Sequence, residues 1–489
     1  MTLPEGKLYI DGKLRGAAGG KTYDVIGPWT GEVVGQAADA SAADVEEAIA
    51  AARRAFDQTD WPTNEALRLD LVRKFEAGLK ANRDRFVELA RVEGGAALAA
   101  TSGPIVDMPL GYCGQLIALY GKVEWTKDMG QAEVWGRKSD RFVVKEPSGV
   151  VGAITPWNVP LYIAVGKVIP ALLVGCTVVL KAAPETPLIN ALLGEVAAEA
   201  GFPAGVFNVI TSGDPATAGE MLVTDPRVDV ISFTGSTAIG KRIMERAAPT
   251  LKRLFLELGG KSATIVLDDL EDISPILMGS LVCFHAGQGC AYPTRLLIPR
   301  SKYPMAVAIL EQVYAGYAQV WGGYDDPANV MGPVISAKQK ARVLDYIAIG
   351  QQEGARLLAG GKAAEGKGEG FFIEPTCFVD VTNEMRIARE EIFGPVLVVI
   401  PYDGDEEAIR IANDSDYGLS GGVYGADRER ALGVARRLRT GSVNVNGGMA
   451  IMADLPFGGY KQSGIGKEWG LEGFDEYLET KSIGVGVAG

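Results

Sequence analysis

Cys290 stands in a sequence setting that favours a reactive thiol. It follows Gly287, Gln288 and Gly289 in the run FHAGQGCA. Small neighbours leave a thiol accessible, and backbone N–H groups near a helix start would lower its pKa and stabilise an oxyanion that develops beside it. The alternative is a cysteine that is simply buried. We adopt that interpretation for the four cysteines among apolar residues, which are Cys113, Cys176, Cys283 and Cys377.

His285 is the only histidine of the chain. Any site that needs two or more imidazoles is therefore excluded, including His-clustered zinc sites and HExxH proteases. His285 is also the only imidazole that could activate Cys290, but the two residues are five positions apart. Cys–His pairs usually come together from distant segments. We expect a structural role for His285 and no metal ion.

Two other side chains could act on a carbonyl group. Asn158 lies between two prolines in PWNVP, directly after the apolar run VVGAIT. Because proline fixes φ, the turn is rigid and the amide NH₂ could stabilise an oxyanion; an Asx-type turn is the structural alternative. Glu257 is flanked by leucines in LELGGK. Partial desolvation would raise its pKa toward that of a general base, whereas a buried, hydrogen-bonded Glu or a surface strand charge is the alternative.

A glycine turn at residues 234–240 has features of a phosphate site. The apolar run VDVISF is followed by TGSTAIG and then by a helical pattern. Free N–H groups, the helix dipole and the Ser236 hydroxyl would face a phosphate there, and Gly235 would let it approach closely. A glycine turn with a serine N-cap explains the same pattern, and the spacing is not GxGxxG. Glu390 and Glu391 in EEIFGPV are two adjacent carboxylates. A metal site would need further ligand residues, and none lies at a suitable spacing in the sequence.

The elements that must position these residues alternate between strand and helix patterns. Residues 7–35 are typical of strands and turns, and amphipathic helices are predicted from Ser41 and over about 63–91. From Val150 short apolar runs alternate with helical stretches, which predicts a parallel sheet, and a second β/α series starts near Glu257. We therefore predict two α/β units that join at the ELGG glycines, with ligands at the C-terminal ends of the strands.

The composition of the 489-residue chain excludes other classes of protein. With 48 Lys and Arg against 61 Asp and Glu, the net charge of −13 disfavours nucleic acid and anionic lipid. Five scattered cysteines without a CxxC pair indicate no disulfide framework. The N-terminus has no signal-peptide pattern, and the most hydrophobic stretch, residues 150–180, is interrupted by prolines and Lys167. We expect a cytoplasmic protein without membrane or nucleic-acid partners.

Six motifs, in order, resemble those of the aldehyde dehydrogenase superfamily across essentially the whole chain: PWNVP, FTGSTAIG, LELGGKS, GQGC, EEIFGPV and PFGGYKQSGIGKE. The resemblance implies an α/β fold with a Rossmann-like dinucleotide-binding domain (1–121 and 143–256) and a catalytic domain (257–469). Oligomerisation elements would lie at 122–142 and 470–489. It also implies a homodimer or homotetramer, in which Arg253 and Glu479 would meet across subunits.

The resemblance assigns roles to individual residues. Cys290 would be the nucleophile, Glu257 the general base and Asn158 the oxyanion donor, while Lys167 would support catalysis. An aldehyde would be oxidised to the acid through a thiohemiacetal and a thioester on Cys290, which water deprotonated by Glu257 would hydrolyse. The implied NAD(P) contacts are Ile154, Trp157, Lys181, Gly213, Gly235, Ser236, Gly240, Leu258, Glu391 and Phe393.

Two departures from the family pattern bear on cofactor and substrate. Members that prefer NAD often carry an acidic residue three positions after the lysine matching Lys181, to bind the 2′-hydroxyl. Here that residue is Pro184, and Glu185 would substitute; we expect NAD rather than NADP.

Positions that are aromatic in members acting on quaternary-ammonium aldehydes are not aromatic here, which predicts a wide aliphatic pocket for medium to bulky hydrophobic or aromatic aldehydes. The predicted pocket residues are Val159, Gly166, Ile451 and Ala291.

Three alternatives remain on the same fold. A cysteine hydrolase or acyltransferase would use Cys290 and Asn158 but would have no use for FTGSTAIG or EEIFGPV. A non-catalytic binding protein would not need Cys290, Glu257 and Asn158 together. An enzyme that acylates CoA would use CoA in place of water, and Glu257 favours hydrolysis.

Overall fold

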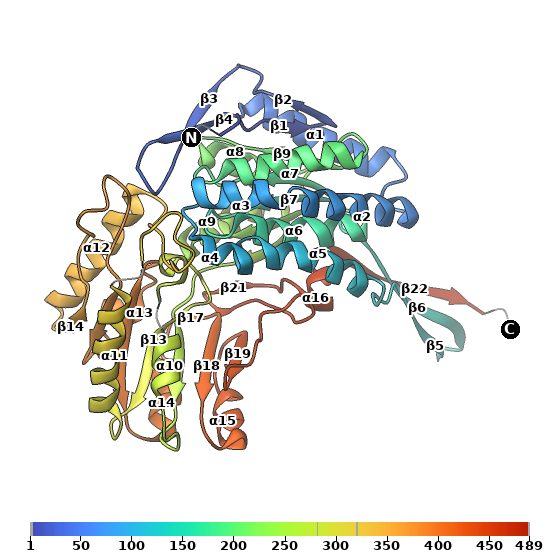
Figure 1. Ribbon diagram of the computed structural model, residues 1–489. Coiled ribbons are helices and arrows are strands. Elements are labelled where there is room, and N and C mark those ends of the chain that lie inside the picture. The colour runs from blue at the N-terminus through green and yellow to red at the C-terminus, as the bar shows by residue number, and fades with distance from the viewer. Residues whose placement is uncertain (1–2, 281, 319–320, 488–489) are drawn as a thin grey trace.

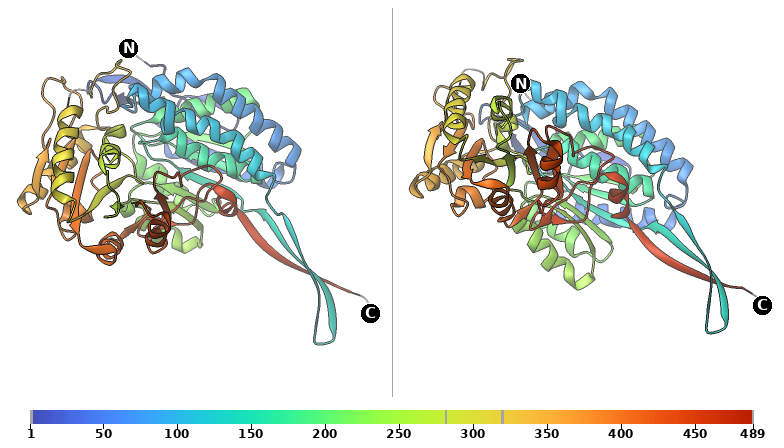
Figure 2. Two further views of the ribbon diagram at one scale, coloured as in Figure 1. Left: turned by 60° about the horizontal axis from the view of Figure 1, so that its bottom comes forward. Right: turned by 90° about the horizontal axis from the view of Figure 1, so that it is seen from below.

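The computed structural model of the protein describes residues 3–280, 282–318 and 321–487. The outermost residues of the predicted N-terminal domain and C-terminal element, 1–2 and 488–489, lie outside the described residues. Two α/β units lie side by side, and a narrow three-stranded sheet projects from them (Figures 1 and 2). No helix of the described residues is long and apolar enough to cross a membrane.

An eight-stranded sheet forms the core of the first unit. Its order is β2-β1-β9-β8-β7-β10-β11-β21, and the strands from β9 to β11 are parallel. β7 and β8 are buried along their whole length, as expected for a parallel sheet covered by helices on both faces. The strands are β1 (Leu8–Ile10), β2 (Lys13–Arg15), β7 (Val150–Ile154), β8 (Thr177–Lys181), β9 (Phe207–Ile210), β10 (Val230–Thr234), β11 (Arg253–Glu257) and β21 (Gly464–Ile465).

Helices on the first unit begin and end largely where the sequence predicts. α1 starts after Ser41, which forms a capping box with Asp44. The helix predicted over 63–91 is instead two helices, because the Asn82 side chain donates to the Gly78 carbonyl at 2.9 Å and closes the end of α2. The main helices are α1 (Ala42–Gln58), α2 (Glu65–Ala81), α3 (Arg83–Val92), α5 (Asp107–Tyr120), α6 (Pro160–Val174), α7 (Pro187–Ala200), α8 (Pro215–Thr224) and α9 (Thr237–Ala247).

A seven-stranded sheet forms the core of the second unit. Its order is β14-β15-β16-β13-β12-β18-β19, and only the edge pair β14–β15 is antiparallel among the strands that the structure describes in it. The strands are β12 (Ser262–Val266), β13 (Pro293–Pro299), β14 (Arg356–Ala359), β15 (Thr376–Val379), β16 (Val396–Tyr402), β18 (Ser420–Tyr424) and β19 (Ser442–Val445). Its helices include α10 (Ser274–Gly279), α11 (Tyr303–Tyr317), α12 (Ala337–Gln352), α13 (Arg386–Arg389), α14 (Gly404–Asn413) and α15 (Arg428–Ala435).

The two sheets join at the ELGG glycines. β11 ends at Glu257 in the first sheet and β12 begins at Ser262 in the second, so residues 258–261 make the whole connection. The chain later returns to the first sheet, where β21 pairs antiparallel with β11. Residues near Glu257 are therefore covered both by the connection and by the returning segment.

The projecting sheet consists of β5 (Thr126–Val134), β6 (Arg137–Pro147) and the C-terminal β22 (Leu478–Gly486), in the order β22-β6-β5. Figures 1 and 2 show it extending away from both units. Arg253 and Glu479, the residues predicted to meet across subunits, lie beside each other within the chain. The two side chains pair within one chain at 3.2 Å, because β22 leaves the body next to β11.

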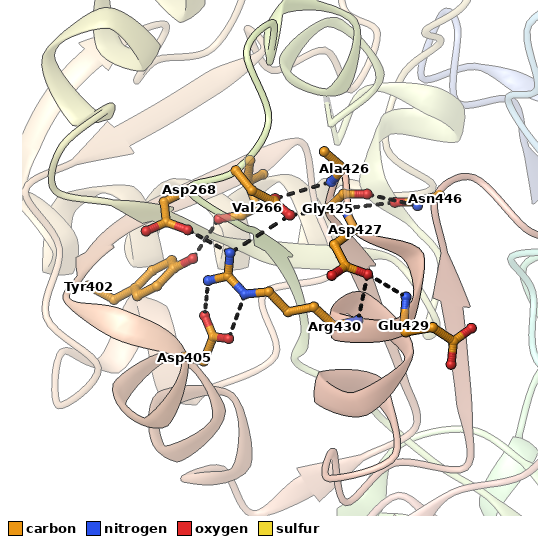
Figure 3. Close-up of polar contacts among 11 residues, drawn as sticks. Val266, Asp268, Tyr402, Asp405, Gly425, Ala426, Asp427, Glu429, Arg430 and Asn446 are labelled. Carbon is orange, nitrogen blue, oxygen red and sulfur yellow. Dashed lines mark hydrogen bonds and ion pairs between the residues drawn. The ribbon is translucent and has the colours of Figure 1, made fainter.

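A network around Arg430 ties the second unit together at the end of β12 that is remote from the junction (Figure 3). The Arg430 guanidinium binds both Asp405 oxygens, at 2.9 and 2.6 Å, and one Asp268 oxygen at 2.8 Å. These charges raise the pKa of Arg430 and hold α15 against α14. Asn446 exchanges two hydrogen bonds with the Gly425 backbone, each of 2.9 Å, beside this network.

Candidate active site

Cys290 lies on a loop between a short 3₁₀ turn (Phe284–Gly287) and β13. Two glycines let this loop pack against neighbouring turns. A Cβ on Gly260 would collide with the Cys290 carbonyl oxygen, and a Cβ on Gly287 would collide with the Gly394 carbonyl oxygen. Gly287 also has a φ of +71°, which glycine adopts without strain. The GQGC, ELGG and EEIFGPV motifs therefore meet at the junction of the two sheets.

The Cys290 thiol is half-buried, whereas the other four cysteines are buried. Burial, followed by the charges of Glu391 and Glu257, raises the pKa of the Cys290 thiol to about 12. The backbone groups of Cys290 and Ala291 lower this pKa, as the sequence led us to expect, but burial and the two carboxylates outweigh them. The thiol of the free protein is therefore protonated at neutral pH.

Asn158 reaches the Cys290 loop from the C-terminal end of β7. Its side chain is buried, and Nδ2 donates to the Gln288 carbonyl oxygen at 2.9 Å. A carboxamide carries two N–H bonds, so one remains after this contact. The amide lies on the turn between β7 and α6 that the two prolines delimit, and it can donate to a negatively charged oxygen formed beside Cys290.

Glu257, the last residue of β11, has a deeply buried carboxylate. The residue is 2% exposed, and neither carboxylate oxygen has a hydrogen-bond partner among the described residues. Burial, and then the charge of Glu468, raises the pKa of Glu257 well above its ordinary value. A Cβ on Gly458 would lie 2.6 Å from Oε1, so the PFGG turn packs directly on this carboxylate. In its deprotonated form, a carboxylate whose pKa is raised is a stronger base than an ordinary one.

Lys167 lies in a buried polar network behind Glu257. Its Nζ donates to Ser232 Oγ at 3.1 Å and lies 3.2 Å from Glu468 Oε1, with both charged side chains almost fully buried. Ser232 in turn contacts the Tyr477 hydroxyl at 3.1 Å. Sequence reasoning identified Lys167 but missed Glu468, although Glu468 ends the PFGGYKQSGIGKE motif. Burial raises the pKa of Glu468, and Lys167 opposes that shift.

His285 does not reach Cys290 as a base in this arrangement. The residue is buried, and burial lowers the pKa of the imidazole to about 4, so the ring is neutral at pH 7. Neither ring nitrogen has a hydrogen-bond partner among the described residues. Within the same residues, no group of three His, Cys, Asp or Glu side chains could hold a metal ion.

The residues expected to bind the dinucleotide lie along one edge of the first sheet. They follow or end five adjacent parallel strands, at the carboxyl ends where ligands of such sheets bind. Ser236 caps α9 by accepting from the Ile239 N–H at 3.4 Å. Lys181 is buried, and burial lowers its pKa to about 8. The set at this edge is Ile154, Trp157, Lys181, Gly213, Gly235, Ser236, Gly240 and Leu258.

Glu391 and Phe393 approach the same edge from the second unit. Glu391 Oε1 accepts from the Gly260 N–H at 2.9 Å, and burial raises its pKa to about 6. The Phe393 ring packs edge-to-face on Trp157, with ring centroids 5.3 Å apart. A cavity of about 490 Å³ lies beside Trp157 and Glu185. Residues of α12 and α13 that sequence reasoning missed form its other wall, including Lys338, Gln339, Arg342, Tyr346 and Arg386.

Three of the four predicted pocket residues pack against the same apolar cluster as Cys290. Val159, Ala291 and Ile451 are half-buried and pack, with Cys290, against one apolar cluster. That cluster contains the mutually packed rings of Tyr112, Tyr162 and Trp469, whose centroids lie 5.0 to 5.8 Å apart. Tyr112, Tyr162 and Trp469 lie outside the four positions that the sequence predicts to form the pocket.

Gly166 faces Trp469 rather than an open space. A Cβ on Gly166 would lie 2.8 Å from the indole Cζ2 and 3.1 Å from Glu468 Cδ. We therefore expect Gly166→Trp to destabilise the protein by about 1–3 kcal/mol through overpacking, rather than only to narrow the pocket. Denaturant unfolding measures this loss. Gly433→Trp, at an open helix position, is the matched control, and equal stability of both variants would contradict the prediction.

The sequence model of the "Aldehyde dehydrogenase family" matches residues 15–483. The chain belongs to the aldehyde dehydrogenase family. It is accordingly an enzyme, an oxidoreductase that acts on aldehydes. The putative aldehyde dehydrogenase DhaS of Bacillus subtilis is 41% identical over 98% of this chain and 96% of its own. The 3-succinoylsemialdehyde-pyridine dehydrogenase of a Pseudomonas species is also 41% identical, over 98% of each chain.

Solved aldehyde dehydrogenase structures share the fold. The aldehyde dehydrogenase of Mycobacterium tuberculosis, complexed with NAD⁺, superposes with a TM-score of 0.93 at 44% identity, over 99% of this chain and 98% of that one. The C291A mutant of aldehyde dehydrogenase C from Pseudomonas syringae, complexed with NAD⁺ and octanal, superposes with a TM-score of 0.90 at 38% identity, over 98% and 96%. The α/β fold expected from the motifs is thereby confirmed.

Proposed function

We propose that this aldehyde dehydrogenase oxidises a hydrophobic aldehyde to the carboxylic acid with NAD, through covalent catalysis by Cys290. The observation that carries the proposal is the convergence of a half-buried thiol, a buried amide donor and a buried carboxylate of raised pKa at the sheet junction. The same junction borders the carboxyl ends of the parallel strands of the first sheet.

In the first half-reaction, the Cys290 thiol loses its proton to solvent, and the resulting thiolate attacks the aldehyde carbon. A C–S bond forms, and the carbonyl oxygen becomes an oxyanion that meets the free N–H of Asn158 and the Cys290 backbone N–H. Each such donor contributes about 3 kcal/mol at the transition state. A bound nicotinamide would supply the acceptor for the hydride that leaves this carbon, and the group on Cys290 would then be a thioester.

In the second half-reaction, Glu257 takes a proton from a water molecule that attacks the thioester carbon. The new C–O bond forms as the C–S bond breaks, which releases the acid and frees the Cys290 thiol. Glu257 is suited to this step because its oxygens have no other partner among the described residues. Lys167 keeps the neighbouring Glu468 paired, at 3.2 Å, and thereby limits the negative charge near Glu257.

The residues present fit a dinucleotide. The N-terminus of α9 with its Ser236 cap offers free N–H groups to a phosphate, and the cavity beside Trp157 is lined by Lys338 and Arg342. NAD is favoured because relatives of known structure are complexed with NAD⁺. We assign dinucleotide binding to residues 1–121 and 143–256, catalysis to 257–469 and assembly to 122–142 and 470–489.

Adding a carboxylate at position 184 should increase the preference of the enzyme for NAD over NADP. Pro184 and Glu185 follow the buried Lys181, and Glu185 is in electrostatic contact with Lys181 and Lys338. We expect Pro184→Glu to raise the KM for NADP about 10-fold or more, with a smaller change for NAD, because a carboxylate repels a 2′-phosphate. Steady-state kinetics with both cofactors measure this. Pro203→Glu, at another half-buried loop proline, is the control; an equal effect on both cofactors would contradict the prediction.

Medium to bulky hydrophobic or aromatic aldehydes are the proposed substrates. The cluster of Tyr112, Tyr162 and Trp469 and the aliphatic Val159 and Ile451 support this class. One relative was crystallised with octanal, and another is named as the dehydrogenase of a pyridine semialdehyde; both agree with this substrate class. The test is formation of reduced cofactor with NAD and NADP across aliphatic and aromatic aldehydes, with and without CoA. Cofactor-independent ester cleavage that outruns oxidation would instead favour the hydrolase alternative.

A homodimer or homotetramer is the proposed assembly. The projecting sheet supports it, because little of β5 and β22 is covered within the chain and Trp135 at the tip of the hairpin is 98% exposed. Uncovered strand edges and apolar side chains of this kind pair readily with another chain. Light scattering of the purified protein measures the assembly.

A further inference from the structure

Gln288 is a buried amide whose hydrogen bonds link the Cys290 loop to two other segments. The residue is 1% exposed. Its Oε1 accepts from the Ile335 N–H at 2.8 Å, and its Nε2 donates to the His285 carbonyl oxygen at 3.1 Å. Its own carbonyl oxygen accepts from Asn158 Nδ2 at 2.9 Å. One residue thus connects Asn158, the Cys290 loop and the segment that leads into α12.

The turn that Gln288 closes has an unusual backbone. His285, Ala286 and Gly287 are all left-handed, with φ values of 50°, 52° and 71°. Left-handed conformations are uncommon for residues other than glycine, so this turn persists only because its surroundings hold it. Gln288 supplies two of those restraints, since its backbone N–H, at 3.1 Å, and its side-chain Nε2 both donate to the His285 carbonyl oxygen.

The contact with Asn158 has a geometric consequence. The two N–H bonds of a carboxamide are coplanar and point in fixed directions. When one N–H is bound to the Gln288 carbonyl oxygen, the direction of the other is determined as well. The free N–H is the one that would meet an oxyanion on the carbon bonded to Cys290.

We propose that Gln288 is a positioning residue that holds the left-handed turn at residues 285–287 and thereby fixes its own carbonyl oxygen, which aims the free N–H of Asn158. This inference rests on the proposed roles of Cys290 and Asn158. Gln288 acts through Asn158, so its loss should lower kcat and leave the KM for the aldehyde nearly unchanged. The effect of its loss should also depend on the presence of Asn158.

A double-mutant cycle tests the proposal on the full-length protein. Gln288→Met keeps the volume but removes both side-chain hydrogen bonds, and Gln288→Asn keeps the amide but is too short to make both. We expect either variant to lower kcat for octanal oxidation about 10- to 100-fold. In an Asn158→Ala background, the same changes should cost less than about 3-fold, because they act through a donor that is already gone.

A matched control separates positioning from general loss of stability. Asn329 is a buried amide that holds another loop through the Gly322 and Met331 N–H groups, at 3.0 and 3.1 Å, and the Gly323 carbonyl oxygen, at 2.7 Å. Asn329→Ala should lower the melting temperature and leave kcat per folded site unchanged. Two results would overturn the proposal. One is a loss of kcat from Gln288→Met that is as large in the Asn158→Ala background as in the wild type. The other is a fall in kcat for Asn329→Ala equal to that for Gln288→Met.

The same double-mutant cycle is measured a second time with another reaction, the cleavage of p-nitrophenyl acetate in the absence of cofactor. This reaction needs the thiol and the oxyanion donor but no hydride acceptor. A wild type that oxidises no aldehyde would refute the proposed function, and the ester cycle would still test Gln288. Coupled losses in the ester cycle would support its positioning role, and independent losses would overturn it.

Discussion

Replacing Cys290 with alanine is expected to abolish aldehyde-dependent formation of reduced cofactor, with turnover falling by about 10⁴-fold or more. The reason is that no other described thiol is accessible, since Cys113, Cys176, Cys283 and Cys377 are buried. Steady-state kinetics on the purified variant measure the loss. Cys283→Ala is the matched control, because Cys283 is buried seven positions earlier and should affect stability more than turnover.

The same thiol gives a measurement that needs no substrate. Iodoacetamide should label one cysteine per native chain, and Cys290→Ala should remove that labelling. Since only the thiolate reacts and the pKa of Cys290 is about 12, the labelling rate of the free protein should rise about tenfold per pH unit between pH 7 and 9. Full turnover in Cys290→Ala, or labelling that is independent of pH, would contradict the proposed role.

Glu257→Gln is expected to stall the enzyme after the first half-reaction. Glutamine keeps the shape of the side chain but cannot accept a proton from water, so hydrolysis of the thioester should slow about 10²- to 10⁴-fold. Rapid mixing with aldehyde and NAD should show a burst of one reduced cofactor per active site, followed by slow turnover. Loss of the burst together with turnover would contradict this assignment.

The pH dependence of turnover follows from the raised pKa of Glu257. Below that pKa the carboxyl group is protonated and cannot act as a base, so turnover of the wild type should fall as the pH is lowered through it. Glu257→Gln should lack this acidic limb. Glu93→Gln serves as the control, because Glu93 is equally buried but binds the Leu188 and Ile189 backbone N–H groups, at 2.9 and 2.7 Å, and should leave the profile unchanged.

Most of the fold could be predicted because it depends on local patterns. Short apolar runs followed by helical periodicity indicated the parallel sheets, and the Ser41 capping box marked the start of α1. The break at Asn82 was missed because a side chain that closes one helix end leaves the helical periodicity on either side intact. The in-chain pair of Arg253 and Glu479 was missed because it depends on the path of β22 beside β11.

The sequence by itself determined which side chains are available for chemistry: a cysteine after two glycines in GQGC, an amide between prolines and a glutamate before two glycines. It also determined the family, through the order of its motifs. Only the tertiary structure decided the environment of these groups. The burial of Glu257 beside Glu468, the raised pKa of Cys290 and the closure of the Gly166 space by Trp469 all join residues far apart in sequence. Desolvation and close packing depend on what surrounds a side chain in space, and local sequence patterns do not contain that information.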